Sequence, residues 1–190
     1  MRFFVATKMQ RGYNSHDGIV AISPPMRIRH AQLADLSRIV AIYNASIPGR
    51  MATADTTPVT VAARASWFRD FDPAQRPLWV LTDSSEETVR GWLSLRSFYG
   101  RPAYHSTVEI AVYVDPSARR DGVGKTLLAH ALASAPALGI RTVLAFVFGH
   151  NAPSIALFEK SGFAAWGRLP RVAELDGVER DLAILGRRVA

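Results

Sequence analysis

Residues 104–136 constrain the fold most, because they predict a strand, a basic turn and a helix in immediate succession. Apolar and other residues alternate from Tyr104 to Asp115, as in a strand that buries one face. Gly122 then opens a helix with leucines at helical spacing, and Pro136 should end that helix. The face opposite the apolar one carries Thr107, Glu109, Ala111 and Tyr113. Glu109 therefore lies in mid-strand, upstream of the basic turn.

The rest of the chain alternates predicted strands and helices, which favours one mixed α/β domain. The expected strands cover 26–30, 78–81, 89–98, 141–148, 163–174 and 178–185, and the expected helices begin after Asp35, Thr60 and Asn151. Asp176-Gly177 predicts the turn of a closing hairpin. Residues 1–25 end in a serine and two prolines, so we expect a flexible N-terminal extension before a domain at 26–190.

The composition limits the chemistry that this chain of 190 residues can perform. Hydrophobic residues make up 48% and charged residues 21%, which suits a single globular core. Cysteine is absent, so a disulfide framework, a thiolate nucleophile and a cysteine zinc site are excluded. The net charge of +7 favours anionic partners, but the basic residues are scattered, which argues against a nucleic acid. No stretch approaches the ~20 apolar residues of a membrane span and no secretory signal is recognisable, so we expect a cytoplasmic protein without a membrane partner.

The basic turn has the sequence Arg119-Arg120-Asp121-Gly122-Val123-Gly124-Lys125-Thr126. At such a turn, free backbone N–H groups and the helix dipole favour a bound anion. The end of the turn imitates a nucleotide-binding P-loop, but that motif needs a glycine five positions before Gly124, where Arg119 stands. The same residues fit Arg-x-x-Gly-x-Gly, in which arginines neutralise a diphosphate and glycines let it approach the backbone. The turn therefore predicts a diphosphate site that is not a P-loop.

This turn resembles the acetyl-CoA loop of the GNAT acetyltransferases. A second GNAT signature places asparagine at a helix start and Lys-x-Gly-Phe at its end, and it resembles Asn151-Ala-Pro-Ser154 followed by Lys160-Ser-Gly162-Phe163. Two motifs in the right order and spacing make the resemblance specific. It implies a GNAT fold of the α/β (α+β) class, with a central twisted, mixed, mostly antiparallel sheet that is splayed between its fourth and fifth strands and flanked by helices. It also implies acetyl-CoA as the co-substrate.

Four further segments are Ile42-Tyr43-Asn44, Arg101-Pro102-Ala103-Tyr104, Thr107-Val108-Glu109 and Val112-Tyr113-Val114-Asp115-Pro116. They resemble the phosphinothricin acetyltransferases and their relatives that acetylate amino acids such as methionine sulfone or sulfoximine. The resemblance covers residues 26–185. It implies a homodimer that transfers an acetyl group directly from acetyl-CoA to the primary amine of a small amino-acid-like acceptor.

The resemblance also assigns roles to individual residues. Glu109 takes the position of the general base, which would remove the amine proton through a water. We expect burial beside the apolar strand to raise its pKa toward the working range. Acetyl-CoA would be held by Val112, Tyr113, Val114, Arg119, Arg120, Asp121, Gly122, Val123, Gly124, Lys125, Asn151 and Ser154. Apart from the resemblance, the basic and aromatic residues Arg101, Tyr104 and His105 stand just before the Glu109 strand, where we expect them to hold a carboxylate, phosphinate or sulfone of the acceptor.

Phe158 departs from the family pattern, which places tyrosine or histidine there as a proton donor to the departing thiolate. Phenylalanine cannot donate, so we expect activity without an acid at this position, with Tyr113, His150 or water as a substitute. Two alternatives stay open: an N-α-acetyltransferase of proteins or peptides on the same scaffold, and an acyl-CoA-binding sensor without catalysis. The histidines show no metal-ligand spacing, so no metal is expected.

Overall fold

A computed structural model describes residues 26–83 and 88–189. The extension expected at 1–25 lies outside these residues, as do residues 84–87 and 190. The described strands are β1 (Met26–His30), β2 (Leu78–Asp83), β3 (Val89–Ser97), β4 (Thr107–Val114), β5 (Thr142–Phe148), β6 (Ala164–Leu175) and β7 (Val178–Arg188). The described helices are α1 (Leu36–Asn44), α2 (Val61–Arg69), α3 (Val123–Ser134) and α4 (Ala152–Lys160).

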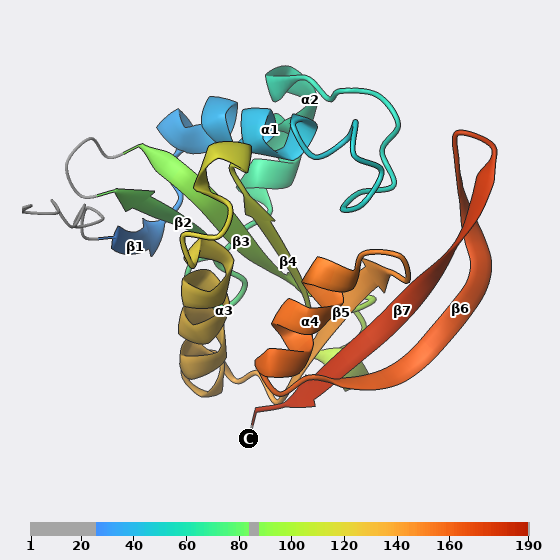
Figure 1. Ribbon diagram of the computed structural model, residues 1–190. Coiled ribbons are helices and arrows are strands. Elements are labelled where there is room, and N and C mark those ends of the chain that lie inside the picture. The colour runs from blue at the N-terminus through green and yellow to red at the C-terminus, as the bar shows by residue number, and fades with distance from the viewer. Residues whose placement is uncertain (1–25, 84–87, 190) are drawn as a thin grey trace, which may run out of the picture.

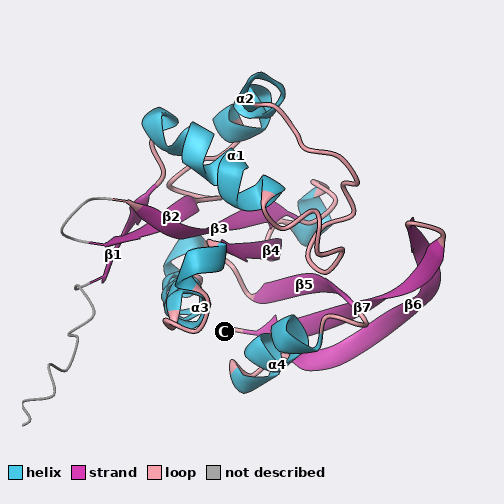
Figure 2. Ribbon diagram, turned by 45° about the horizontal axis from the view of Figure 1, so that its top comes forward, coloured by secondary structure: helices cyan, strands magenta, loops and turns pink. Residues whose placement is uncertain are grey.

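The strands form one mixed sheet in the order β1-β2-β3-β4-β5-β7-β6, with helices on both faces (Figures 1 and 2). α1 and α2 lie on one face, and α3 and α4 lie on the other. Neighbouring strands are antiparallel except for the parallel pair of β4 and β5. This arrangement confirms the predicted α/β (α+β) class with a mostly antiparallel sheet.

The sheet opens between β4 and β5. These strands pair only at three positions, where residues 107–109 face residues 142–144. Beyond Glu109, β4 continues to Val114 along β3, and β5 continues to Phe148 along β7. The two strands diverge in Figure 2. The predicted splay between the fourth and fifth strands is therefore confirmed, and Glu109 marks the point where it begins.

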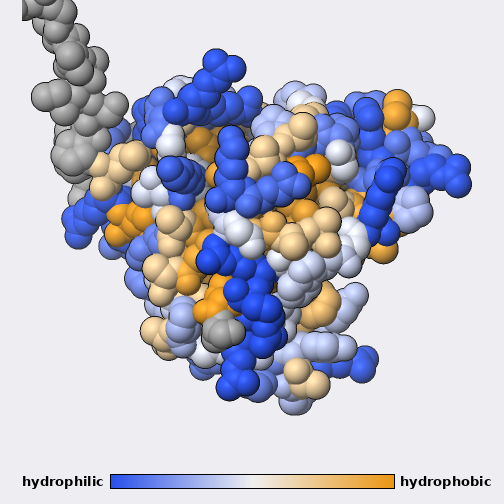
Figure 3. Space-filling model, turned by 60° about the horizontal axis from the view of Figure 1, so that its bottom comes forward, coloured by the Kyte–Doolittle hydropathy of each residue, from blue (hydrophilic) through white to orange (hydrophobic). Residues whose placement is uncertain are grey.

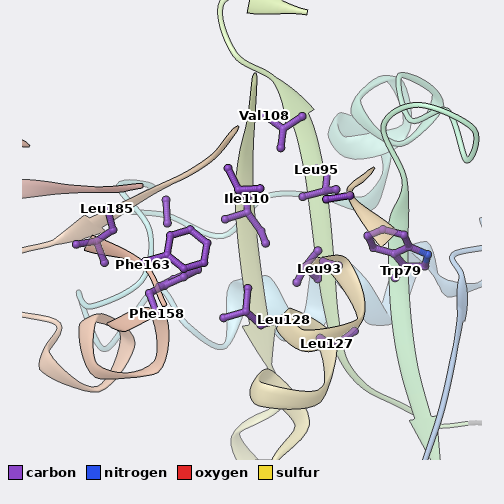
Figure 4. Close-up of a cluster of buried hydrophobic side chains, with 14 of the residues drawn as sticks. Trp79, Leu93, Leu95, Val108, Ile110, Leu127, Leu128, Phe158, Phe163 and Leu185 are labelled. Atoms are coloured by element: carbon purple, nitrogen blue, oxygen red, sulfur yellow. The ribbon is translucent and has the colours of Figure 1, made fainter. Parts of the chain in front are cut away.

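The main core lies between the sheet and the α3 and α4 helices. Figure 4 shows Leu127 and Leu128 of α3 in the same cluster as Val108 and Ile110 of β4, both of which are buried as the alternation predicts. Phe158 of α4 is 3% exposed and packs edge-on against Phe163, with ring centroids 5.0 Å apart. A second core cluster, on the other face, joins α1 to β2 and β3 through Ile39, Ile42, Leu78, Val80, Val89 and Trp92.

Helix starts follow the predicted caps, whereas one predicted strand start is wrong. Thr60 Oγ1 accepts a hydrogen bond from Ala63 N at 3.1 Å, and Asn151 Oδ1 accepts one from Ser154 N at 3.1 Å. The strand expected from Tyr104 begins only at Thr107. The residues Pro102–Tyr104 form a short 3-10 turn, because proline presets its first backbone angle and the chain then bends back.

The C-terminal hairpin of β6 and β7 carries the outer edge of the sheet. Its turn at Asp176–Gly177 is confirmed, with both residues at positive φ. The hairpin reaches past α4 and curves toward the loop after α1 (Figure 1). Although β6 lies at the edge, it exposes large apolar side chains, and together with β7 the hairpin shows Trp166, Leu169, Val172 and Val178.

Candidate active site

The splay leaves one edge of β4 without a strand partner. Along Ile110–Val114, β4 pairs with β3 on one side and no described strand lies on the other. An unpaired strand edge presents backbone N–H and C=O groups to a ligand. The stretch Val112–Val114, predicted to hold acetyl-CoA, belongs to this edge. The gap is thus lined by backbone hydrogen-bonding groups on one side.

Glu109 stands at the mouth of this gap. It is the last residue of β4 that pairs with β5, and its side chain is exposed. The predicted burial of Glu109 is wrong, because Val108 and Ile110 take the core-facing positions on either side of it. The helices on its own face cover the other end of the strand, at Tyr113. The carboxylate is therefore open to water and to an incoming molecule.

Tyr113 lies on the same face of β4 as Glu109, near the other end of the strand. Its ring stacks on Trp92 with centroids 4.5 Å apart and lies 5.1 Å from the ring of Tyr43. Burial, followed by the nearby phenol of Tyr43, raises the pKa of the Tyr113 hydroxyl above its usual value. The hydroxyl donates to the carbonyl of Ala52 at 3.2 Å. Tyr113, expected as a substitute proton donor, is thus a weaker acid than usual and is engaged by a loop.

The loop between α1 and α2 crosses the gap at residues 50–52, which we call the bridging loop. His150 Nε2 lies 2.8 Å from the carbonyl oxygen of Arg50, and because a carbonyl only accepts, this nitrogen is the donor. Asn151 Nδ2 donates to the next carbonyl, Met51, at 2.8 Å. Tyr113 donates to the third, Ala52. Since His150 and Asn151 follow β5 and Tyr113 belongs to β4, the bridging loop is fastened to both sides of the splay.

Charged groups anchor the bridging loop at either end. Arg50 donates to Asp176 at the tip of the β6–β7 hairpin, with Nε to Oδ2 at 2.7 Å and Nη2 to Oδ1 at 3.0 Å. Downstream, Asp55 accepts from the Tyr43 hydroxyl at 2.6 Å and from Arg64 Nη2 at 3.0 Å. Sequence reasoning missed this loop, because hydrogen bonds to backbone carbonyls leave no residue pattern.

Releasing the hairpin anchor is expected to expose the bridging loop to protease. In Asp176→Asn, Arg50 loses its charged partner, so trypsin should cleave after Arg50 about two- to fivefold faster, as befits an exposed ion pair. Mass spectrometry of timed digests measures the rate. Glu174→Gln removes one charge from the same hairpin, with no ion pair recorded for that side chain, and serves as the control. Equal cleavage in both variants would show that Asp176 does not anchor the loop.

The basic turn between β4 and α3 is built around two left-handed residues. Arg120 has a φ of 74°, and Gly122, the N-cap of α3, has a φ of 81°. A Cβ at Gly122 would meet nothing within 4 Å, so the backbone angle rather than the space favours glycine there. At Gly124 an added Cβ would lie 3.4 Å from Leu157 and 3.5 Å from Val114. The turn stays open above the first N–H groups of the helix, which have no helical acceptor.

Cationic side chains flank this turn. Arg119, Arg120 and Lys125 are exposed, and none takes part in the ion pairs recorded for the described residues. Asp121 faces Arg90, with 3.8 Å between Oδ2 and Nη2. Cations beside unpaired helix N–H groups are a suitable setting for a diphosphate. The structure therefore brings together the residues that the sequence singled out for this anion.

Asp115 fixes where the turn leaves β4. It caps the short 3-10 turn Pro116–Ala118 by accepting from Ser117 N at 2.8 Å, and it also accepts from Arg38 Nη2. Burial alone would raise the pKa of Asp115, but the hydrogen bonds from Ser117 and the charges of Arg38 and Arg90 outweigh it and hold the pKa below its usual value. The carboxylate thus stays ionised and holds the turn to α1. No residue pattern predicts the ion pair between Asp115 and Arg38.

The start of α4 reaches the splay from the β5 side. Asn151 is buried, and its amide serves both as the helix cap and as a donor to the bridging loop. Ser154 is partly buried in the first turn of α4. Phe158, one turn further on, faces the core. The first turn of α4 therefore faces the gap, and Phe158 is held by core packing.

The residues predicted to hold the acceptor lie in the connection before β4. Arg101 is exposed and precedes the 3-10 turn. Tyr104 lies against an aromatic pair, with ring centroids 5.5 Å from Phe98 and 6.1 Å from Tyr99. His105 Nδ1 lies 3.0 Å from the carbonyl oxygen of Pro102. This connection leads directly into the strand of Glu109, at the end of β4 opposite the basic turn.

No group of three or more histidine, cysteine, aspartate or glutamate side chains is placed to hold a metal ion in the part of the chain that the structure covers. None of the helices in residues 26–83 and 88–189 is long and apolar enough to cross a membrane.

Comparison with known proteins decides the family. The family model described as the acetyltransferase (GNAT) family matches residues 39–163, which is more than half of the chain. This chain belongs to the GNAT family. It is thus a GNAT acetyltransferase, which uses acetyl-CoA, and its opened sheet is the GNAT fold.

Individual GNAT relatives cover nearly the whole domain. YwnH of Bacillus subtilis, which is named provisionally as a phosphinothricin acetyltransferase, is 51% identical over 165 residues, covering 87% of this chain and all of YwnH. The L-methionine sulfoximine/L-methionine sulfone acetyltransferase of Pseudomonas aeruginosa is 34% identical and covers 83% of this chain and 91% of its own. A GNAT phosphinothricin acetyltransferase of Sinorhizobium meliloti, solved with acetyl-CoA, has a TM-score of 0.80 at 32% identity, covering 86% of this chain and 88% of that one. The predicted family resemblance is confirmed.

Proposed function

We propose that this GNAT acetyltransferase moves an acetyl group from acetyl-CoA directly to the primary amine of a small amino-acid-like acceptor. The observation that carries the proposal is the position of Glu109, an exposed carboxylate at the point where β4 and β5 separate. The relatives named for phosphinothricin and for methionine sulfoximine and sulfone support this class of acceptor.

The acetyl-CoA side of the site uses the groups above α3 and along β4. Arg119, Arg120 and Lys125 neutralise the diphosphate, and the backbone from Asp121 to Gly124 donates to it. The unpaired edge at Val112–Val114 supplies hydrogen bonds to the pantetheine amides, as an added strand would receive them. Asn151 and Ser154 line the opposite side of the gap.

Glu109 makes the acceptor nucleophilic. An alkyl amine carries a proton near neutral pH, so its lone pair is free only after that proton leaves. Glu109 takes the proton through one water, which its exposed side chain can reach. The nitrogen then bonds to the acetyl carbon and loses its second proton to water, the carbon–sulfur bond breaks, and the electron pair leaves with the sulfur.

The leaving sulfur needs no dedicated acid in this site. A model thiol has a pKa of about 8.5, so its anion is a competent leaving group near neutral pH. Phe158 cannot donate a proton, and its place in the core shows a packing role for this side chain. We assign the protonation of the thiolate to solvent after release.

Restoring a hydroxyl at position 158 is expected to leave turnover almost unchanged. For Phe158→Tyr we expect kcat within about twofold of the parent, because the thiolate departs unaided. The buried hydroxyl should lower the melting temperature by about 2–10 °C. Steady-state assays and thermal denaturation measure the two effects. A large gain in kcat would mean that the parent site lacks a necessary acid.

Acceptor binding falls to the connection before β4. Arg101 is exposed with no ion pair recorded among the described residues, so its guanidinium is available to a carboxylate, phosphinate or sulfone. Tyr104 and His105 add an aromatic wall and a further hydrogen-bonding group. These groups suit a zwitterionic amino acid.

A thiol-release screen tests the proposed function. The enzyme is incubated with acetyl-CoA and methionine sulfone, methionine sulfoximine, phosphinothricin, other amino acids, polyamines or short peptides. The chain contains no cysteine, so it contributes no thiol background. We expect turnover with the amino-acid analogues. Turnover confined to peptides would favour an N-α-acetyltransferase, and acetyl-CoA binding without turnover on any amine would favour an acyl-CoA sensor.

We also propose a homodimer formed through β6. This edge strand of 12 residues has no outer partner among the described strands and exposes Trp166, Leu169 and Val172. An unpaired apolar edge is an association site. Sedimentation equilibrium should give a dimer, and Leu169→Glu with Val172→Glu should give a monomer. A monomeric parent protein would contradict the proposal.

The assignment of residues 1–25 as an extension remains a proposal, as does a cytoplasmic location. The hydrogen-bonded sheet in the described part of the chain begins at Met26, which pairs with Asp83 at the start of β1. Removing residues 1–25 should therefore leave both the melting temperature and the turnover number unchanged. Loss of either would show that these residues belong to the domain.

A further inference from the structure

A cavity lies at the opposite end of α3 from the diphosphate turn. Its volume is about 430 Å³, within the range of small-molecule sites. The residues on which the argument rests are Arg76, His105, Pro136, Leu138 and Arg141. They come from the segment before β2, the connection before β4 and the connection from α3 to β5. Figure 3, which turns the lower end of the molecule forward, shows hydrophilic and hydrophobic side chains interspersed over that face.

Basic groups dominate the polar lining of this cavity. Arg76, Arg141 and His105 contribute to it, and no aspartate or glutamate lines it in the part of the chain that the structure describes. The ion pairs recorded for the described residues include neither arginine. Two guanidinium groups therefore share a hollow without a carboxylate to balance them.

Arg76 is held rigidly in this hollow. Its Nε donates to Ser97 Oγ at 2.9 Å, its Nη1 to the carbonyl of Gln75 at 2.8 Å and its Nη2 to the carbonyl of His105 at 2.5 Å. All three acceptors are neutral, and partial burial lowers the pKa of Arg76. A partly desolvated cation with neutral partners gains more from a bound anion than a fully hydrated one does.

Arg141 and the cavity floor indicate the shape of that anion. Arg141 is exposed and its side chain has no hydrogen bond recorded, so it can turn toward a ligand that Arg76 already holds. Pro136 and Leu138 supply apolar surface beside the two cations. Guanidinium groups match the planar geometry of a carboxylate, and the apolar surface suits an aliphatic body.

We propose that this cavity is a binding site for a small aliphatic carboxylate, separate from the acetyl-CoA site. The 12 residues of α3 place about 18 Å of helix between the cavity and the diphosphate turn. Arg76 supplies the fixed cation, and Arg141 supplies the mobile one. The cavity shares His105 with the connection proposed to hold the acceptor, but neither arginine belongs to that acceptor site, so substitution of Arg141 tests the cavity alone.

Calorimetric titration with hexanoate tests this site. The protein is first saturated with coenzyme A, so that the diphosphate turn is occupied and only a second site is measured. Acetate and hexanamide are titrated in parallel, because acetate lacks the aliphatic body and hexanamide lacks the charge. We expect hexanoate to bind, acetate to bind several-fold more weakly and hexanamide to give no signal.

Substitution of the mobile cation then locates the site. Arg141→Gln should weaken hexanoate binding about tenfold, and the variant should keep the fold because the Arg141 side chain is exposed and forms none of the ion pairs found among the described residues. Arg69→Gln, which removes an exposed arginine from the end of α2, is the matched control and should bind hexanoate as the parent does. The proposal is overturned by no hexanoate binding, by unchanged binding in Arg141→Gln, or by equal binding of hexanamide. Inorganic phosphate binding as tightly as hexanoate would also overturn it, in favour of a general anion site.

Discussion

Replacing Glu109 by glutamine is expected to lower kcat by about 10²–10⁴-fold, the usual contribution of a general base. Glutamine keeps the size and the hydrogen-bonding reach of the side chain but cannot accept the amine proton. Because Glu109 is exposed and lies apart from the basic turn, acetyl-CoA affinity should not change. Thiol-release kinetics with saturating acceptor measure kcat, and calorimetry measures acetyl-CoA affinity.

A matched variant separates this effect from a general loss of charge. Glu159 is an exposed glutamate on α4 with no ion pair recorded among the described residues, so Glu159→Gln removes the same charge without touching the splay. It should keep the parent rate. If Glu109→Gln also kept the parent rate, the base would have to be another group or bulk water.

The double variant Arg119→Gln with Arg120→Gln is expected to weaken acetyl-CoA binding by about 100-fold or more. Each charge-assisted hydrogen bond to a phosphate contributes about 1.5–3 kcal/mol, and two are removed. The difference in acetyl-CoA affinity between the parent and the double variant should become smaller as salt is added. Salt screens the exposed arginine charges, which only the parent has at these two positions. Calorimetry at two ionic strengths measures both effects.

The control for this pair keeps the net charge identical. Arg27→Gln with Arg69→Gln removes two exposed arginines from β1 and α2, away from the basic turn. Its acetyl-CoA affinity should match that of the parent within about twofold. Equal weakening in the two double variants would show that overall charge, and not the turn at Arg119 and Arg120, attracts the ligand.

Most of the fold could be predicted from local sequence, because local rules determine it. Alternation along β4 identified which residues enter the core, and the caps at Thr60 and Asn151 marked two helix starts. The splay itself followed from the family resemblance and not from any residue pattern. The early start expected for β4 failed because a proline at position 102 favours a 3-10 turn over an extended chain.

Parts of the site could not be predicted, because they depend on contacts between distant residues. The exposure of Glu109 depends on where α1 and α2 cover the sheet, and they cover Tyr113 instead. The hydrogen bond between His150 and the Arg50 carbonyl joins positions 100 residues apart. Phe158 illustrates the converse case. The sequence showed that a proton donor was missing, and the structure shows that this side chain completes the core.

The short ladder between β4 and β5 divides the molecule along its own sequence. Residues 26–114 build β1 to β4, residues 142–188 build β5 to β7, and three residue pairs join the two sets. Any rotation about that ladder moves the unpaired ends of β4 and β5 more than the ends that pair with each other. The angle between the two strands at Thr107–Glu109 therefore sets the width of the gap beside Val114. Glu109 lies next to the axis of this rotation, so its carboxylate moves least when the gap widens.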